Sequence, residues 1–79
     1  MAPTILNQGS YRFFFYSGDK YEPVHVHVER DNCVAKFWID PILLHSSHGF
    51  RRNELIKIEK IIKANEEIIK EAWYDYFGN

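Results

Sequence analysis

The clearest pattern in the chain is a strict alternation of apolar and polar residues from Val24 to Glu29. Valines occupy one set of positions, and His25, His27 and Glu29 occupy the other. Successive side chains of a strand point to opposite faces of its sheet. The pattern therefore predicts a strand with one valine face and one histidine face, and the β-branched valines favour that conformation.

Two flanking stretches predict the neighbours of this histidine strand. Residues 11–16 are aromatic on both faces and predict a strand before it, separated from it by the turn-rich residues 17–20. After it, Asp31 and Asn32 suit a two-residue hairpin turn. Residues 33–40 then predict the third strand, which Asp40-Pro41 ends.

A two-residue turn fixes the register of that hairpin. The apolar residues of both strands then share one face, and both histidines gain a neighbour on the other face. We expect directly opposed side chains to be about 4.5–5.5 Å apart at Cβ. The predicted pairs are Val24–Ile39, His25–Trp38, Val26–Phe37, His27–Lys36, Val28–Ala35, Glu29–Val34 and Arg30–Cys33.

The last third of the chain carries an apolar stripe at helical spacing, with lysines on the opposite side. Asn53 is a suitable N-cap, and Gly78 is a suitable stop. Asn65 precedes two glutamates and predicts a kink or a break, so one helix or two are open alternatives.

The remaining segments give weaker signals. Residues 4–6 predict a short extended arm, residues 42–44 a turn of helix or a fourth extended piece, and residues 45–49 a loop. The predicted architecture is a single α+β domain over residues 1–79. It has a three-stranded antiparallel sheet and a long C-terminal helix, straight or kinked, on the valine face.

Composition narrows the class of protein. The chain has 79 residues and a net charge of -1, so its overall charge does not favour binding to nucleic acid. Its aromatic content of 16% is high enough for some rings to form a surface that binds a partner. The single cysteine excludes an internal disulfide framework. No apolar run is long enough to be a signal peptide or a membrane span. We expect the protein to be cytoplasmic and not to associate with a membrane.

The histidine face is the one part of the predicted fold where side chains suited to catalysis or binding lie together. Two imidazoles one strand step apart can act as acid and base on one phosphodiester, and Lys36 can stabilise its negative charge. Under this hypothesis the protein is a metal-independent ribonuclease that needs no cofactor, and His25, His27 and Lys36 are its catalytic residues. The predicted substrate-binding residues are Arg12, Tyr16, Trp38, Arg51 and Arg52.

Three other interpretations remain open. In the first interpretation, the histidines are ordinary exposed residues of a strand. In the second, the protein is a non-enzymatic protein-binding module that uses its aromatic sheet face and helix, as the partner or antitoxin-like subunit of a complex or with a second copy of itself. In the third, the four imidazoles of His25, His27, His45 and His48 bind a metal ion.

Several stretches of the chain carry a resemblance, and they span almost its whole length: Pro3–Ile5, Arg12–Ser17, Glu22–Val28, Ala35–Pro41, Gly49-Phe50 and Trp73–Phe77. Together they resemble a family of small prokaryotic proteins known as domain of unknown function 4160. Its most specific element is a Glu-Pro-Pro-His-x-His box followed by Lys-Phe-Trp, and Val24 replaces the second proline here. The resemblance implies no activity. It implies a gene beside that of a second small protein, in a pair similar to a toxin–antitoxin module.

Overall fold

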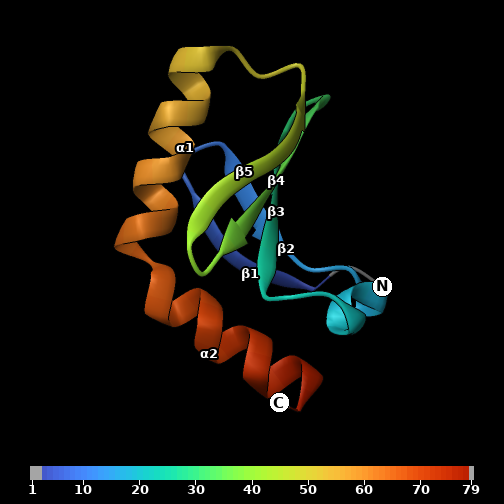
Figure 1. The fold of residues 1–79 in the computed structure, drawn as a ribbon. Coiled ribbons are helices and arrows are strands. Elements are labelled where there is room, and N and C mark those ends of the chain that lie inside the picture. Colours follow the sequence, from blue (N-terminus) through green and yellow to red (C-terminus); the bar gives the residue numbers. More distant parts are fainter. Residues whose placement is uncertain (1–2, 79) are drawn as a thin grey trace.

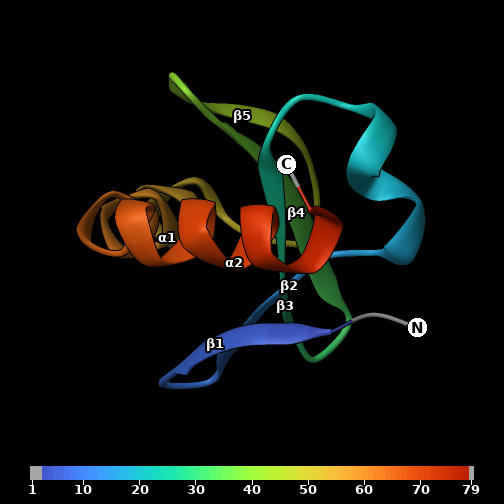
Figure 2. The same cartoon turned by 90° about the horizontal axis from the view of Figure 1, so that it is seen from below.

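A computed structural model describes residues 3–78 of the chain. Five strands form one antiparallel sheet in the order of the sequence, and two helices pack against it (Figure 1). Figure 2 shows a short 3-10 helix, η1, on the side of the sheet away from α1. The elements are β1 (Thr4–Gln8), β2 (Tyr11–Phe14), η1 (Ser17–Tyr21), β3 (His25–Arg30), β4 (Cys33–Ile39), β5 (Ile42–His48), α1 (Arg52–Ala64) and α2 (Glu66–Phe77).

The α+β class is confirmed, but the prediction of a three-stranded sheet is wrong. The expected N-terminal arm is the edge strand β1, paired with β2. The sheet does not end at Asp40-Pro41, because β5 follows and pairs with β4. Most of β5 is exposed, and its second half is polar, so it lacks the alternation by which a half-buried strand is recognised.

The register of the central hairpin is confirmed from His25–Trp38 to Arg30–Cys33. Asp31 has the left-handed φ of 54° that a tight turn requires. On the other side of β3, Phe14 of β2 pairs with His27 and therefore shares the histidine face.

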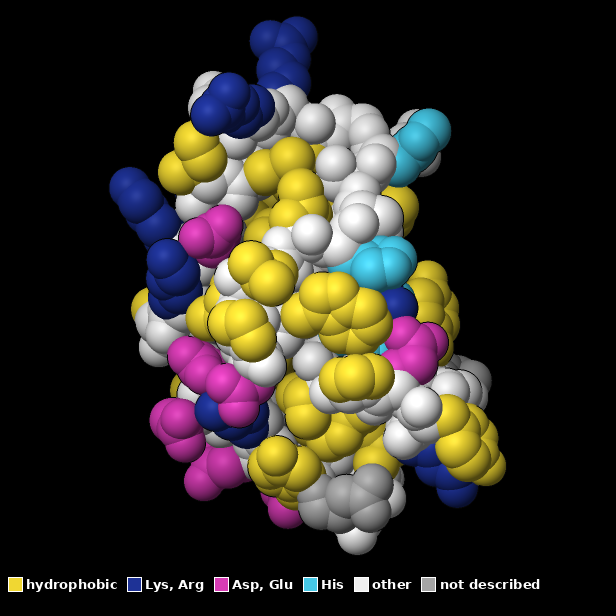
Figure 3. All heavy atoms as spheres, in the orientation of Figure 1, with side chains coloured by type: hydrophobic (Ala, Val, Ile, Leu, Met, Phe, Trp, Pro, Cys, Tyr) yellow, Lys and Arg dark blue, Asp and Glu magenta, His cyan; other side chains and the backbone are white. Residues whose placement is uncertain are grey.

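The valine face holds the main core. Val26, Val28 and Phe37 are at most 1% exposed, and the helices cover them with apolar residues of their own. This packing explains why the strands and the helices are amphipathic. Figure 3 shows charged side chains gathered along the outer side of the helices, with apolar side chains toward the sheet. The helix residues in the core are Ile58, Ile62, Ile69 and Trp73.

The predicted break at Asn65 is confirmed, since α1 ends at Ala64 and α2 begins at Glu66. The side-chain amide of Asn65 donates to the carbonyl oxygen of Ile61 at 2.8 Å. The predicted N-cap at Asn53 is wrong, because α1 begins at Arg52 and already includes Asn53, and Arg51 precedes the helix without a side-chain cap. No helix within residues 3–78 is long and apolar enough to cross a bilayer.

Candidate functional site

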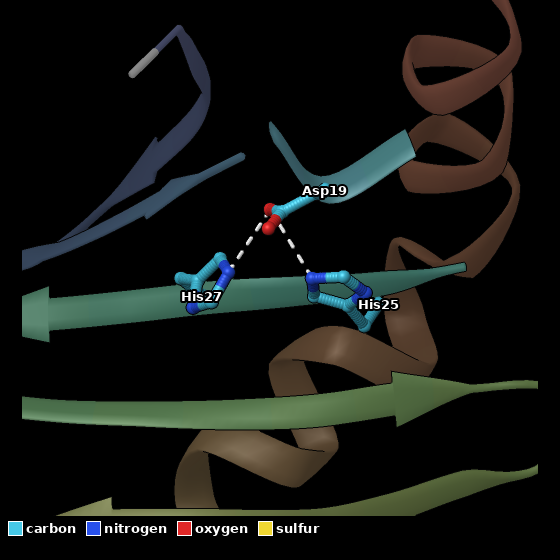
Figure 4. Close-up of side chains that lie close together, drawn as sticks. All are labelled: Asp19, His25 and His27. Carbon is cyan, nitrogen blue, oxygen red and sulfur yellow. Dashed lines mark hydrogen bonds and ion pairs between the residues drawn. The ribbon is translucent and has the colours of Figure 1, made fainter. Parts of the chain in front are cut away.

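Asp19 of η1 meets both histidines of β3 and forms a cluster on the histidine face (Figure 4). One carboxylate oxygen, Oδ2, lies 3.0 Å from Nε2 of His27 and 3.1 Å from Nε2 of His25. The backbone N–H of Tyr16 donates to the same oxygen at 2.8 Å. We call Asp19, His25 and His27 the histidine–aspartate cluster.

The two histidines of the cluster have different surroundings. His25 is fully buried, and its ring lies 5.5 Å from the ring of Trp38 and 5.1 Å from that of Trp73 on α2. His27 keeps 15% of its side chain exposed and packs between Phe14 and Tyr16. His25 therefore has no surface from which to touch a substrate, whereas His27 does.

Burial also affects the charge of His27. It lowers the pKa of His27 below its ordinary value of 6.5, and the nearby carboxylate of Asp19 opposes the shift only in part. The imidazole of His27 is therefore neutral at physiological pH.

The hydrogen bonds of His25 define which of its nitrogens carries a proton. Nδ1 lies 2.8 Å from the carbonyl oxygen of Pro23, which can only accept, so Nδ1 is the donor. Nε2 faces Asp19 but is not aligned for a hydrogen bond, and among residues 3–78 this buried nitrogen has no hydrogen-bond partner. An unprotonated Nε2 would present a lone pair to a carboxylate, so the pair requires a cation, either a proton or a metal ion.

Lys36 lies opposite His27 across the hairpin, as predicted. Its ammonium group is already paired with Glu22 at 2.6 Å and lies 4.7 Å from the centre of the Trp38 ring. The hydrogen bond from Lys36 lowers the pKa of Glu22. An anionic ligand of Lys36 would therefore bind beside this carboxylate or in its place.

A hollow of about 250 Å³ opens beside His27 on the same face. Tyr16 lines it, and its ring is 49% exposed. The remaining polar lining comes from β4 and β5, so this hollow is where two of the predicted catalytic residues, His27 and Lys36, meet solvent. Those polar residues are Lys36, Ser46, Ser47 and His48.

The structure does not bring the other predicted residues into one site. Arg12 shares the histidine face but donates to Glu29 at 2.9 Å. Arg51 and Arg52 are exposed at the start of α1, at the opposite end of the molecule from η1 (Figure 1). His45 is exposed on β5, so the expected set of four imidazoles does not converge.

Asp19 is the functional residue that the sequence reasoning missed. It lies six residues before His25, in a segment interpreted only as a turn. Periodicity cannot reveal it, because η1 rather than a strand register brings it to the histidines. The available signal was its position as an acidic residue in a turn directly before the histidine strand.

Comparison with known proteins gives a family but no activity. A family model described as "Domain of unknown function (DUF4160)" matches residues 10–74. No curated protein and no solved structure gives a significant match.

Proposed function

Because this chain belongs to the DUF4160 family, whose name gives no activity, we propose from the site alone that it is an RNA-cleaving acid–base enzyme. The observation that carries this proposal is the Asp19–His27 contact of 3.0 Å beside a hollow that Lys36 also lines. A carboxylate that orients an imidazole is a recurrent way to position a general base.

The contact with Asp19 assigns the two nitrogens of His27 different roles. Nε2–H donates to the carboxylate, which leaves the lone pair on Nδ1. Nδ1 points away from Asp19 (Figure 4), and the ring lines the hollow. In this proposal Nδ1 removes the proton from a ribose 2′-hydroxyl.

The remaining steps follow from the groups that line the hollow. The 2′-oxygen attacks the phosphorus, the bond to the 5′-oxygen breaks, and a 2′,3′-cyclic phosphate forms. Lys36 takes the phosphate in place of Glu22 and stabilises the charge of the pentacoordinate state. His48 donates the proton that the leaving oxygen needs, and the exposed ring of Tyr16 provides a surface on which a base can stack.

The proposal is tested with purified full-length protein and short RNA oligonucleotides, in EDTA so that metal ions play no part. Mass spectrometry should detect fragments that end in a 2′,3′-cyclic phosphate. We expect His27→Ala to reduce the rate about 10²–10⁴-fold, as for the loss of a general base. His45→Ala removes an exposed imidazole outside the hollow and serves as the matched control.

Two results would overturn the proposal. The first is an absence of cleavage by the wild-type protein under every buffer condition in which it stays folded. The second is equal cleavage by wild type and His27→Ala, which would assign the activity to a contaminant.

A ribonuclease of this kind inside the cytoplasm needs an inhibitor. The small protein expected from the neighbouring gene would supply that role, as in a toxin–antitoxin pair. This part of the proposal rests on the family resemblance. It is tested by expressing the protein with and without its neighbour and by comparing growth.

An apolar groove favours a second candidate function, that of a protein-binding module. It has a volume of about 440 Å³ and is lined by residues of β1 and α2, among them Ile5, Ile68 and Tyr76. Ile68 and Tyr76 are 50% and 44% exposed. Such apolar exposure is typical of a surface that binds another protein.

The binding function is tested by co-expression with the neighbouring gene product. Ile68→Glu should abolish co-purification, whereas Ile56→Glu alters an equally exposed apolar residue of α1 outside the groove and should not. Light scattering on the protein alone reports self-association through the same groove. Retention of the partner by Ile68→Glu would contradict this function.

A further inference from the structure

We propose that the histidine–aspartate cluster is a binding site for one divalent transition metal ion, of the class of Zn²⁺. The inference does not depend on RNA cleavage. It rests on three features of Asp19, His25 and His27: the convergence of their ligand atoms, the hydrogen bonds of His25, and the packing that holds the rings.

The ligand atoms already converge. Each residue offers one donor atom, and the three atoms all lie within 4.8 Å of one another. The two Nε2 atoms lie 3.0 and 3.1 Å from Oδ2 of Asp19. Two ligands of a tetrahedral zinc ion are roughly 3.3 Å apart, given metal–ligand bonds of about 2.0–2.2 Å. An ion therefore fits once Oδ2 moves a few tenths of an ångström away from each nitrogen and the two nitrogens, which lie within 4.8 Å of one another, take up the same spacing.

His25 is arranged as a metal ligand. Its Nδ1–H donates to the carbonyl oxygen of Pro23, which leaves the buried Nε2 as the nitrogen available to an ion; Nε2 points at Asp19 and has no hydrogen-bond partner among the described residues. A metal-binding histidine typically donates its other N–H to a carbonyl or a carboxylate, which fixes the tautomer and the ring. A cation between Nε2 and the carboxylate satisfies both groups.

The surroundings fix the ligands in place before an ion arrives. The rings of Trp38 and Trp73 pack on His25. The backbone N–H of Tyr16 orients the carboxylate of Asp19. Such packing and outer hydrogen bonds limit the reorganisation that binding requires.

The donor set selects the class of ion. Two imidazoles and one carboxylate suit zinc, iron, cobalt or nickel, whereas magnesium and calcium prefer oxygen ligands alone. Three protein ligands leave a coordination position for water, as in catalytic rather than structural zinc sites.

Metal binding also has a consequence for His27. A metal on Nε2 leaves the proton on Nδ1, so the ring becomes a hydrogen-bond donor toward the hollow and can no longer act as a base there. If the proposed RNA cleavage is correct, the bound ion inhibits it.

The test is a calorimetric titration of ZnCl₂ into the full-length protein after EDTA has been removed. We expect one ion per chain. Asp19→Asn and His27→Ala should each weaken binding at least about 100-fold, beyond the loss typical of an outer-shell change. His45→Ala should bind as wild type does, because its imidazole lies outside the cluster. Circular dichroism checks that each variant remains folded.

A second measurement identifies the ligands directly. Co²⁺ in the wild-type protein should give the strong visible absorption of a four-coordinate site, and Asp19→Asn should lose it. The inference is overturned if the wild type shows neither heat nor this absorption. It is also overturned if Asp19→Asn binds Zn²⁺ as tightly as wild type, or if His45→Ala abolishes binding. Since these readouts need no RNA, failure of the ribonuclease proposal leaves them intact.

Discussion

Gly49, between β5 and α1, occupies a position where no other residue fits. Its φ is +93°, a region that residues with a Cβ rarely adopt. A Cβ built there would lie 2.8 Å from the sulfur of Cys33 and 3.3 Å from the Cα of Cys33. Both the backbone and the neighbouring strand therefore exclude a side chain.

We expect Gly49→Ala to lower the free energy of unfolding by about 1–3 kcal/mol, the range for a residue held in a strained conformation. Urea unfolding followed by tryptophan fluorescence measures the loss. Gly18→Ala is the control, because its Cβ would meet nothing within 4 Å. Equal stability of Gly49→Ala and wild type would contradict the account.

The histidines show what residue patterns can predict. Alternation and the hairpin turn predicted the cross-strand neighbours of His25 and His27, and these are confirmed. The pattern could not predict how deeply each histidine is buried. One of the rings that pack on His25 is that of Trp73, 48 residues later in the sequence. Nor could the pattern predict Asp19, whose place depends on how η1 folds back over β3.

Among the elements, Arg30 of β3 and Glu54 of α1 form a link between the sheet and the first helix. The guanidinium donates to both carboxylate oxygens, at 3.0 and 2.8 Å. The hydroxyl of Tyr11 on β2 donates to the same carboxylate at 3.1 Å. A two-point contact of this kind fixes the angle between two elements as well as their separation.

Acid should weaken this link. Burial acts to raise the pKa of Glu54, but the hydrogen bonds from Arg30 and Tyr11 outweigh it and hold the pKa below 4.5. A carboxyl whose pKa is lower in the folded state stabilises the fold above its unfolded pKa, and that stability disappears as pH falls through the folded pKa.

We therefore expect Glu54→Gln to be less stable than wild type at pH 7, with the difference shrinking below pH 4.5. Urea midpoints of both proteins from pH 7 to pH 3 measure this. Because other carboxylates titrate in both proteins, the difference between the two curves is the informative quantity. A difference that does not change with pH would contradict the role of the Glu54 charge.

Elements were predictable where one side is buried and the other exposed. The central hairpin and the two helices have that contrast, and the sequence located them to within a few residues. The edge strands β1 and β5 do not, since β5 residues 43–48 are all exposed. Backbone pairing with β4 rather than burial of its own side chains makes β5 a strand.

For the whole molecule, the metal proposal predicts a change in stability. A ligand that binds only the folded state stabilises it by about 2.7 kcal/mol at a free concentration 100 times the dissociation constant. In a chain of 79 residues this is a large fraction of the total stability. We expect Zn²⁺ to raise the wild-type melting temperature and to leave Asp19→Asn nearly unchanged. An equal rise in both proteins would assign the effect to ions bound elsewhere.

Because Asp19 lies on η1 and not on the sheet, its position affects how fast a bound ion would be released. The histidines belong to the central strand of the sheet, whereas the carboxylate belongs to a 3-10 helix of only five residues. Short segments of this kind open locally far more often than central strands do. Opening of η1 alone would release an ion while the sheet stays intact. The lifetime of a bound ion would then follow the opening rate of η1, and its binding would slow amide hydrogen exchange around Asp19 without altering that of β3.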